Sequence, residues 1–113
     1  MTSSPPCRCR QPPFDFKDFV RKDIGVDTNR GRFGDVAVER CVHCGSLWLT
    51  YQVAYEAFTA SGRWFRGPIA EDVAARIRPD EAIPFLERLE AYFQGGSYFK
   101  SSGEISSGPV RAE

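Results

Sequence analysis

The chain has 113 residues, with 15 basic and 15 acidic side chains and a formal net charge of zero. This length predicts one domain, residues 1–113, whose core is rich in its nine Phe, four Tyr and two Trp side chains. The neutral balance lacks the basic excess typical of nucleic-acid-binding proteins, and no apolar run approaches the roughly 18 residues of a membrane span.

Residues 1–13 are predicted to form an extended arm, because four of them are proline and proline opposes helix. The first six residues lack the basic and then apolar pattern of a secretory signal. We therefore expect a cytoplasmic, reducing location and no membrane partner. Cys7 and Cys9 lie in the arm, and we expect them to anchor it.

Residues 15–24 are predicted to form a short helix. Asp15 is a suitable N-cap, Gly25 is placed to end the helix, and four apolar side chains fall on one helical face: Phe16, Phe19, Val20 and Ile24. Residues 26–34, which are rich in glycine and polar side chains, are expected to be a loop.

Three strands are predicted over residues 35–68. Residues 35–41 alternate between apolar and polar side chains, and residues 46–59 place every second side chain on one face, namely Leu47, Leu49, Tyr51, Val53 and Tyr55. A turn at Ser61-Gly62 leads into a third strand at residues 63–66, which Gly67-Pro68 ends. These strands are expected to form an antiparallel meander.

The C-terminal part, residues 69–96, is predicted to be helical. Ile69, Val73 and Ile77 recur every fourth residue before Pro79, and a second helix is expected over residues 81–94. Residues 97–113 are expected to be an edge strand or a flexible tail. The predicted fold class is therefore α+β, a small three-stranded sheet with a short N-terminal helix and two C-terminal helices packed on it.

The four cysteines of the chain fall into two tight pairs that are far apart in sequence, Cys7-x-Cys9 and Cys41-x-x-Cys44. Two such pairs supply the four thiolates of a tetrahedral zinc site, and Gly45 suits the turn after the second pair. We predict one Zn²⁺ per chain, bound by all four cysteines. A disulfide framework, a redox CxxC pair and four ordinary buried thiols are the alternatives.

His43, the only histidine, lies between Cys41 and Cys44. Because four thiolates already complete a closed zinc site, we expect His43 to face solvent. Its alternative roles are those of a substitute ligand or an acid–base group.

The knuckle Cys41-x-x-Cys44-Gly45, placed in the first turn of a β-meander and joined by a distant cysteine pair, resembles the zinc-ribbon class. The resemblance covers residues 7–9 and 35–68, and it departs from the class at Cys7-x-Cys9, where CxxCG is usual. It implies a bound zinc ion and a fold. Zinc ribbons bind nucleic acids, contact proteins or act as structural units, so it implies no activity.

We predict a non-catalytic, zinc-stabilised protein-interaction module that acts as an adaptor, accessory subunit or neutralising partner. The side chains proposed to contact another protein are Trp48, Arg63, Trp64, Phe65 and Arg66. For Trp48, burial in the core is an alternative of equal weight. The second hypothesis is nucleic-acid binding through a shared face of Trp64, Phe65 and five arginines, Arg30, Arg32, Arg40, Arg63 and Arg66. A thiol redox protein or an enzyme is the lesser alternative.

Overall fold

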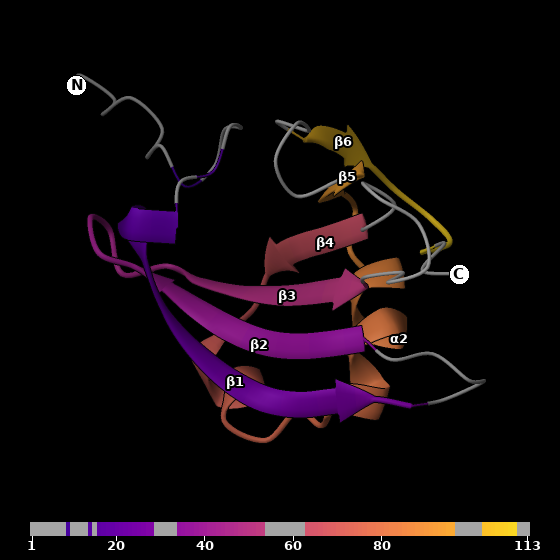
Figure 1. The fold of residues 1–113 in the computed structure, drawn as a ribbon, viewed down its shortest axis with the longest axis horizontal. Helices are drawn as coiled ribbons and strands as arrows, with labels where there is room; N and C mark the ends of the chain where they lie inside the picture. The colour runs from indigo at the N-terminus through magenta and orange to yellow at the C-terminus, as the bar shows by residue number, and fades with distance from the viewer. Residues whose placement is uncertain are drawn as a thin grey trace.

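Among the residues that the structure describes, six β-strands form one antiparallel sheet in which each strand pairs with the next along the chain, in the order β1 to β6 (Figure 1). The structure is a computed structural model, and it describes residues 9, 14, 16–28, 34–53, 63–96 and 103–110. The predicted α+β fold with three strands and three helices is wrong, because the described residues are mostly β.

The predicted helix at residues 15–24 is replaced by a 3-10 turn, η2 (Phe16–Asp18), and a strand, β1 (Phe19–Asp27). β1 runs antiparallel to β2 (Gly34–Cys41), from Phe19 opposite Cys41 to Asp27 opposite Gly34. The β-branched residues of this segment favour strand, and pairing along its length satisfies the backbone groups that face β2. The predicted loop therefore begins later than residue 26, and residues 29–33 lie outside the described part of the chain.

The predicted antiparallel meander is confirmed for its central strands. β2 pairs with β3 (Leu47–Val53), and β3 pairs with β4 (Arg63–Pro68). The knuckle lies in the turn between β2 and β3, as predicted. The proposed continuation of the second strand through residues 54–59 falls outside the described residues.

The C-terminal helices are shorter than predicted. α1 (Glu71–Ala74) is a single turn, and the 3-10 turn η4 (Pro79–Glu81) leads into α2 (Ala82–Glu87). The predicted helix at 81–94 ends early because its last residues become β5 (Tyr92–Gly96), where Phe93 pairs with Arg66 of β4. None of the described helices is long and apolar enough to span a membrane.

β6 (Glu104–Ser106) pairs with β5 and forms one edge of the described sheet. The edge strand predicted at residues 97–99 lies outside the described residues. Three hydrogen bonds fix the segment after β6: the Tyr92 hydroxyl donates to the Gly108 and Pro109 carbonyl oxygens, and the Val110 N–H donates to Glu87.

One face of the sheet packs against α2 and the segments beside it. The apolar side chains that meet there come from four strands and from the helical segment, and they include Val36, Val38, Leu49, Tyr51, Phe65, Ile83, Leu86 and Tyr92. Gly67 of β4 lies under the end of α2, where a Cβ would overlap Leu86 and Leu89. The helical part therefore covers this face, as the sequence analysis expected.

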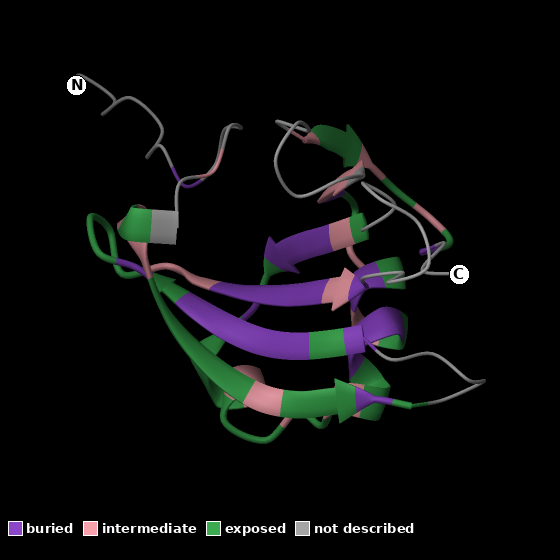
Figure 2. Ribbon diagram, viewed as in Figure 1, coloured by how far each residue is buried: buried purple, intermediate pink, exposed green. Residues whose placement is uncertain are grey.

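The opposite face is also buried at its centre, because consecutive residues in the middle of β2 and β3 are buried; these stretches are purple in Figure 2. Cys41 and Trp48 form a second, smaller core there together with Cys9, and Phe19 and Phe93 pack against it. Cys9 comes from the predicted N-terminal arm. Cys9, which precedes the first strand, thus lies against this face of the sheet, and the second core contains Cys9 and Cys41.

Candidate metal centre

The turn between β2 and β3 holds Cys41 and Cys44 in a hydrogen-bonded knuckle. The Gly45 N–H donates to the Cys41 carbonyl oxygen, and the Cys41 N–H donates to the Ser46 carbonyl oxygen, each at 2.9 Å. Gly45 has a φ of 77°, which glycine adopts without strain. The His43 N–H points at Cys41 Sγ at 3.4 Å, so the turn already presents a donor to this sulfur.

Cys9 completes a three-cysteine cluster with this knuckle. The Sγ atoms of Cys9, Cys41 and Cys44 all lie within 4.8 Å of one another, and the Cys9 and Cys44 sulfurs are 3.5 Å apart. Cys9 and Cys41 are buried, whereas Cys44 is exposed. The three thiols therefore form a cluster that could bind a metal ion.

The sulfur spacing fits a tetrahedral thiolate site. Zinc–sulfur bonds of about 2.3 Å place the sulfurs of a tetrahedral site about 3.8 Å from one another. The Cys9–Cys44 sulfur distance of 3.5 Å and the 4.8 Å limit on all three sulfur pairs bracket that spacing. Cys7, the fourth predicted ligand, lies outside the described residues, so the described site contains three of the four predicted cysteines.

The His43 side chain contacts Asp18 and is not part of the three-cysteine cluster. Its Nε2 lies 2.9 Å from Asp18 Oδ1, and its side chain is 46% exposed. The Val42 N–H also donates to the Asp18 carbonyl oxygen. These two contacts join the knuckle to Asp18, the residue just before β1.

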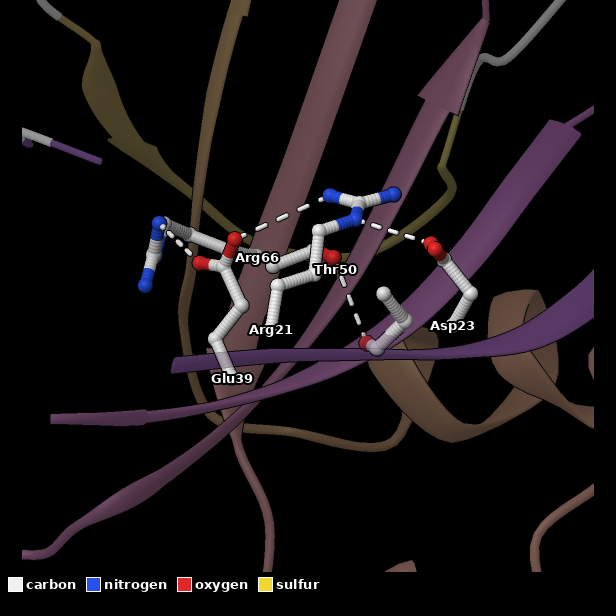
Figure 3. Close-up of polar contacts among 6 residues, drawn as sticks. Arg21, Asp23, Glu39, Thr50 and Arg66 are labelled. Carbon is white, nitrogen blue, oxygen red and sulfur yellow. Dashed lines mark hydrogen bonds and ion pairs between the residues drawn. The ribbon is translucent and has the colours of Figure 1, made fainter. Parts of the chain in front are cut away.

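A buried arginine lies beside the cysteine core. The guanidinium carbon of Arg66 is 4.3 Å from the centroid of the Phe19 ring, 4.5 Å from that of Phe14 and 5.4 Å from that of Trp48. Its Nη1 forms an ion pair with Glu39 Oε1 at 3.1 Å (Figure 3). Burial lowers the pKa of Arg66, while the charges of Glu39, Cys9 and Cys41 act in the opposite direction.

Three of the predicted interaction residues are not at the surface. Trp48 and Phe65 belong to the two cores, and Arg66 is 6% exposed. They are buried because both faces of the central strands are covered, which the predicted three-stranded sheet did not anticipate. Trp64 is half-buried and Arg63 is exposed, so only these two remain available to a partner.

The arginines of the nucleic-acid hypothesis do not form one exposed patch among the described residues. Arg66 is internal, Arg40 forms an ion pair with Glu71 at 3.1 Å, and Arg63 lies at the far end of β4. Arg30 and Arg32 lie outside the described residues. The described part of the chain thus gives this hypothesis no shared basic face.

Sequence reasoning did not identify the side chains that surround the cysteines. The pattern over residues 15–24 predicts a helix that includes Phe19. The alternation over residues 35–41 makes Glu39 a polar position of a strand. A charged residue in each of the two strands that flank β3, Glu39 of β2 and Arg66 of β4, was the available signal. It became interpretable only once the register placed both on the same face.

The chain matches no protein-family model, and searches of curated proteins and of solved structures found no similar protein.

Proposed function

We propose that Cys9, Cys41 and Cys44 bind one Zn²⁺ ion per chain, with Cys7 as the fourth ligand. The observation that carries this proposal is the convergence of three sulfurs from two distant segments within 4.8 Å. Cys9 lies before β1, whereas Cys41 and Cys44 lie at the β2–β3 turn. A shared metal ion would therefore fasten the N-terminal stretch to the sheet.

Zinc is the preferred ion because the donor set is made of thiolates. Soft sulfur ligands in a tetrahedral arrangement select zinc or an iron–sulfur cluster over hard, oxygen-binding cations. A fourth cysteine would close the site, and closed all-cysteine sites are structural. We therefore assign the metal a structural role and the protein a non-catalytic one.

Metal titration of cysteine variants tests this assignment. The metal-free protein is titrated with Zn²⁺ in competition with a chromophoric chelator, and Cys7→Ser, Cys9→Ser and Cys44→Ser are compared with the wild type. The proposal expects a stoichiometry of one and a weakened affinity in all three variants. Wild-type affinity in Cys7→Ser would remove Cys7 from the ligand set, and wild-type affinity in Cys9→Ser would refute the site.

At the level of the whole domain, we propose a zinc-stabilised module that binds another protein through β1. This strand borders the described sheet, it is nine residues long, and it exposes two apolar side chains, Val20 at 64% and Val26 at 47%. A long edge strand is a template for pairing with another chain. The knuckle beside it adds a third exposed valine, Val42.

A comparison of the two sheet edges tests this surface. Val20→Lys places a charge on β1, and Ile105→Lys places one on β6, where Ile105 is 70% exposed. In quantitative affinity purification, a partner bound through β1 is lost with Val20→Lys and retained with Ile105→Lys. Equal retention by both variants would contradict a role for β1.

A further inference from the structure

Arg66 has hydrogen-bond donors that the described protein does not satisfy. Its side chain is 8% exposed, and its Nε and Nη2 atoms are buried with no hydrogen-bond acceptor. The ring faces around it attract the guanidinium but accept no conventional hydrogen bond. A buried donor without an acceptor has lost its hydrogen bonds to water without replacement, and the loss is larger when the donor is charged. Such a group calls for an explanation.

Glu39 neutralises Arg66 only in part, because a second arginine shares this carboxylate. Glu39 Oε1 faces Arg66 Nη1, whereas Oε2 lies 3.7 Å from Arg21 Nη1, and Arg21 in turn contacts Asp23 at 2.9 Å (Figure 3). The Glu39 side chain is itself 11% exposed. Arg66 therefore retains positive charge that is directed away from Glu39.

The cysteine cluster lies on the same face of the sheet as Arg66, and two aromatic side chains, Phe19 and Trp48, lie beside both. Phe19 is the cross-strand partner of Cys41, and Trp48 packs in one cluster with Cys9 and Cys41. Both rings also contact the guanidinium. Three or four thiolates around one divalent ion leave a net negative charge. In this poorly solvated interior, a nearby cation offsets that charge more strongly than it would in water.

We propose that Arg66 is the outer-sphere cation of the cysteine metal centre, held by the Phe14, Phe19 and Trp48 rings so that its charge stabilises the metal-bound thiolates. Arg66 is a positioning residue in this assignment and not a ligand. Glu39 opposes its effect and holds it in place. The inference rests on the metal binding proposed above, and it adds the residue that tunes the affinity.

The test uses substitutions that change charge and conserve size. Glu39→Gln leaves Arg66 charged and removes its competitor, and Glu39→Gln/Arg66→Met removes both charges with similar volume. Arg76→Met is the matched control, because Arg76 is a 76% exposed arginine on the segment that follows α1. For each full-length protein, the dissociation constant for Zn²⁺ is measured by chelator competition at fixed pH, at low and at high salt.

The proposal expects Glu39→Gln to bind Zn²⁺ more tightly than the wild type. It expects the double variant to bind about 10–100-fold more weakly than Glu39→Gln, as outer-sphere substitutions typically do. The loss should persist at high salt, because a buried charge is poorly screened. In Co²⁺-loaded protein, the sulfur-to-cobalt charge-transfer band should move to lower energy in the double variant, a readout that a purely packing role would not move.

Equal affinity of the double variant and Glu39→Gln would overturn the proposal while leaving the metal site intact. A wild type that binds no Zn²⁺ would overturn both the proposed function and this inference. If the double variant does not fold, Glu39→Gln decides alone, and weaker or unchanged binding in that variant contradicts the assignment.

Discussion

Cys9 Sγ lies 3.5 Å from Cys44 Sγ although the two cysteines are 35 positions apart in sequence. Cys9 precedes the sheet, and Cys44 lies in its second turn. Their contact ties Cys9 to the knuckle, and Cys9 also packs with Cys41 and Trp48 in one buried cluster. The cysteine cluster is therefore a structural junction as well as a candidate metal centre.

Removal of a knuckle ligand should make stability independent of zinc. At a free Zn²⁺ concentration about 1,000-fold above the dissociation constant, binding adds about 4 kcal/mol to the free energy of unfolding. Cys41→Ser should lose most of that increment, since metal binding is coupled to folding. Urea unfolding with and without Zn²⁺ measures the difference. A Cys41→Ser protein that gains the full increment would exclude Cys41 as a ligand.

Substitution of the knuckle histidine should leave metal binding intact. His43 contacts Asp18 at a partly exposed position, and such pairs contribute roughly 0.2–1 kcal/mol. His43→Ala is therefore expected to lower stability by less than about 1 kcal/mol and to keep the wild-type affinity for Zn²⁺. Chelator competition on His43→Ala and Cys44→Ser, side by side, checks this. A similar loss in both would make His43 a ligand.

The buried hydrogen bond between Tyr51 and Asp27 should be worth more than the hydrogen bond that the Tyr92 hydroxyl shares between the Gly108 and Pro109 carbonyl oxygens. The Tyr51 hydroxyl donates to Asp27 Oδ2 at 2.7 Å, and both residues are buried. Hydrogen bonds to charged groups contribute about 1.5–3 kcal/mol, and those to neutral carbonyls about 0.5–1.5 kcal/mol. Tyr51→Phe should therefore cost more stability than Tyr92→Phe in urea unfolding. The reverse order would contradict the assigned acceptors.

The packing of α2 should matter for the fold but not for the metal. Leu86 is fully buried between α2 and the sheet, on the face opposite the cysteines. Leu86→Ala should cost about 2–5 kcal/mol of unfolding free energy. Glu90→Ala, at an exposed position, serves as the control. A Leu86→Ala protein that folds but binds Zn²⁺ much more weakly would show that the two faces are coupled.

Local sequence patterns correctly predicted the segments in which a single pattern dominates, either the alternation of a strand or the spacing of two cysteines. The alternation at 35–41 and 46–59 and the Cys41-x-x-Cys44-Gly45 turn predicted β2, β3 and the knuckle, because alternate residues in the middle of β2 and β3 are apolar side chains that pack in the core beside α2. The pairing of the cysteines likewise predicted that a residue before the sheet would meet the knuckle, as Cys9 does.

Two segments that form strands were predicted to be helices, and the reason is the same for both. Around Phe19 and around Phe93, apolar residues recur at spacings that fit a helical stripe, but neighbouring strands offer each segment a full backbone ladder. Pairing across the sheet outweighs the small differences in intrinsic propensity. No sequence pattern indicated that Arg66 is buried, because arginine is seldom buried without a specific partner.

The metal content of the purified protein tests the central claim most directly. Elemental analysis is combined with native mass spectrometry of the intact chain, before and after treatment with a chelator. The account predicts one zinc ion per chain, whose removal loosens the N-terminal stretch from the sheet. A metal-free chain whose mass is lower by the hydrogens of one or two disulfides would contradict it and would assign the clustered cysteines to thiol oxidation.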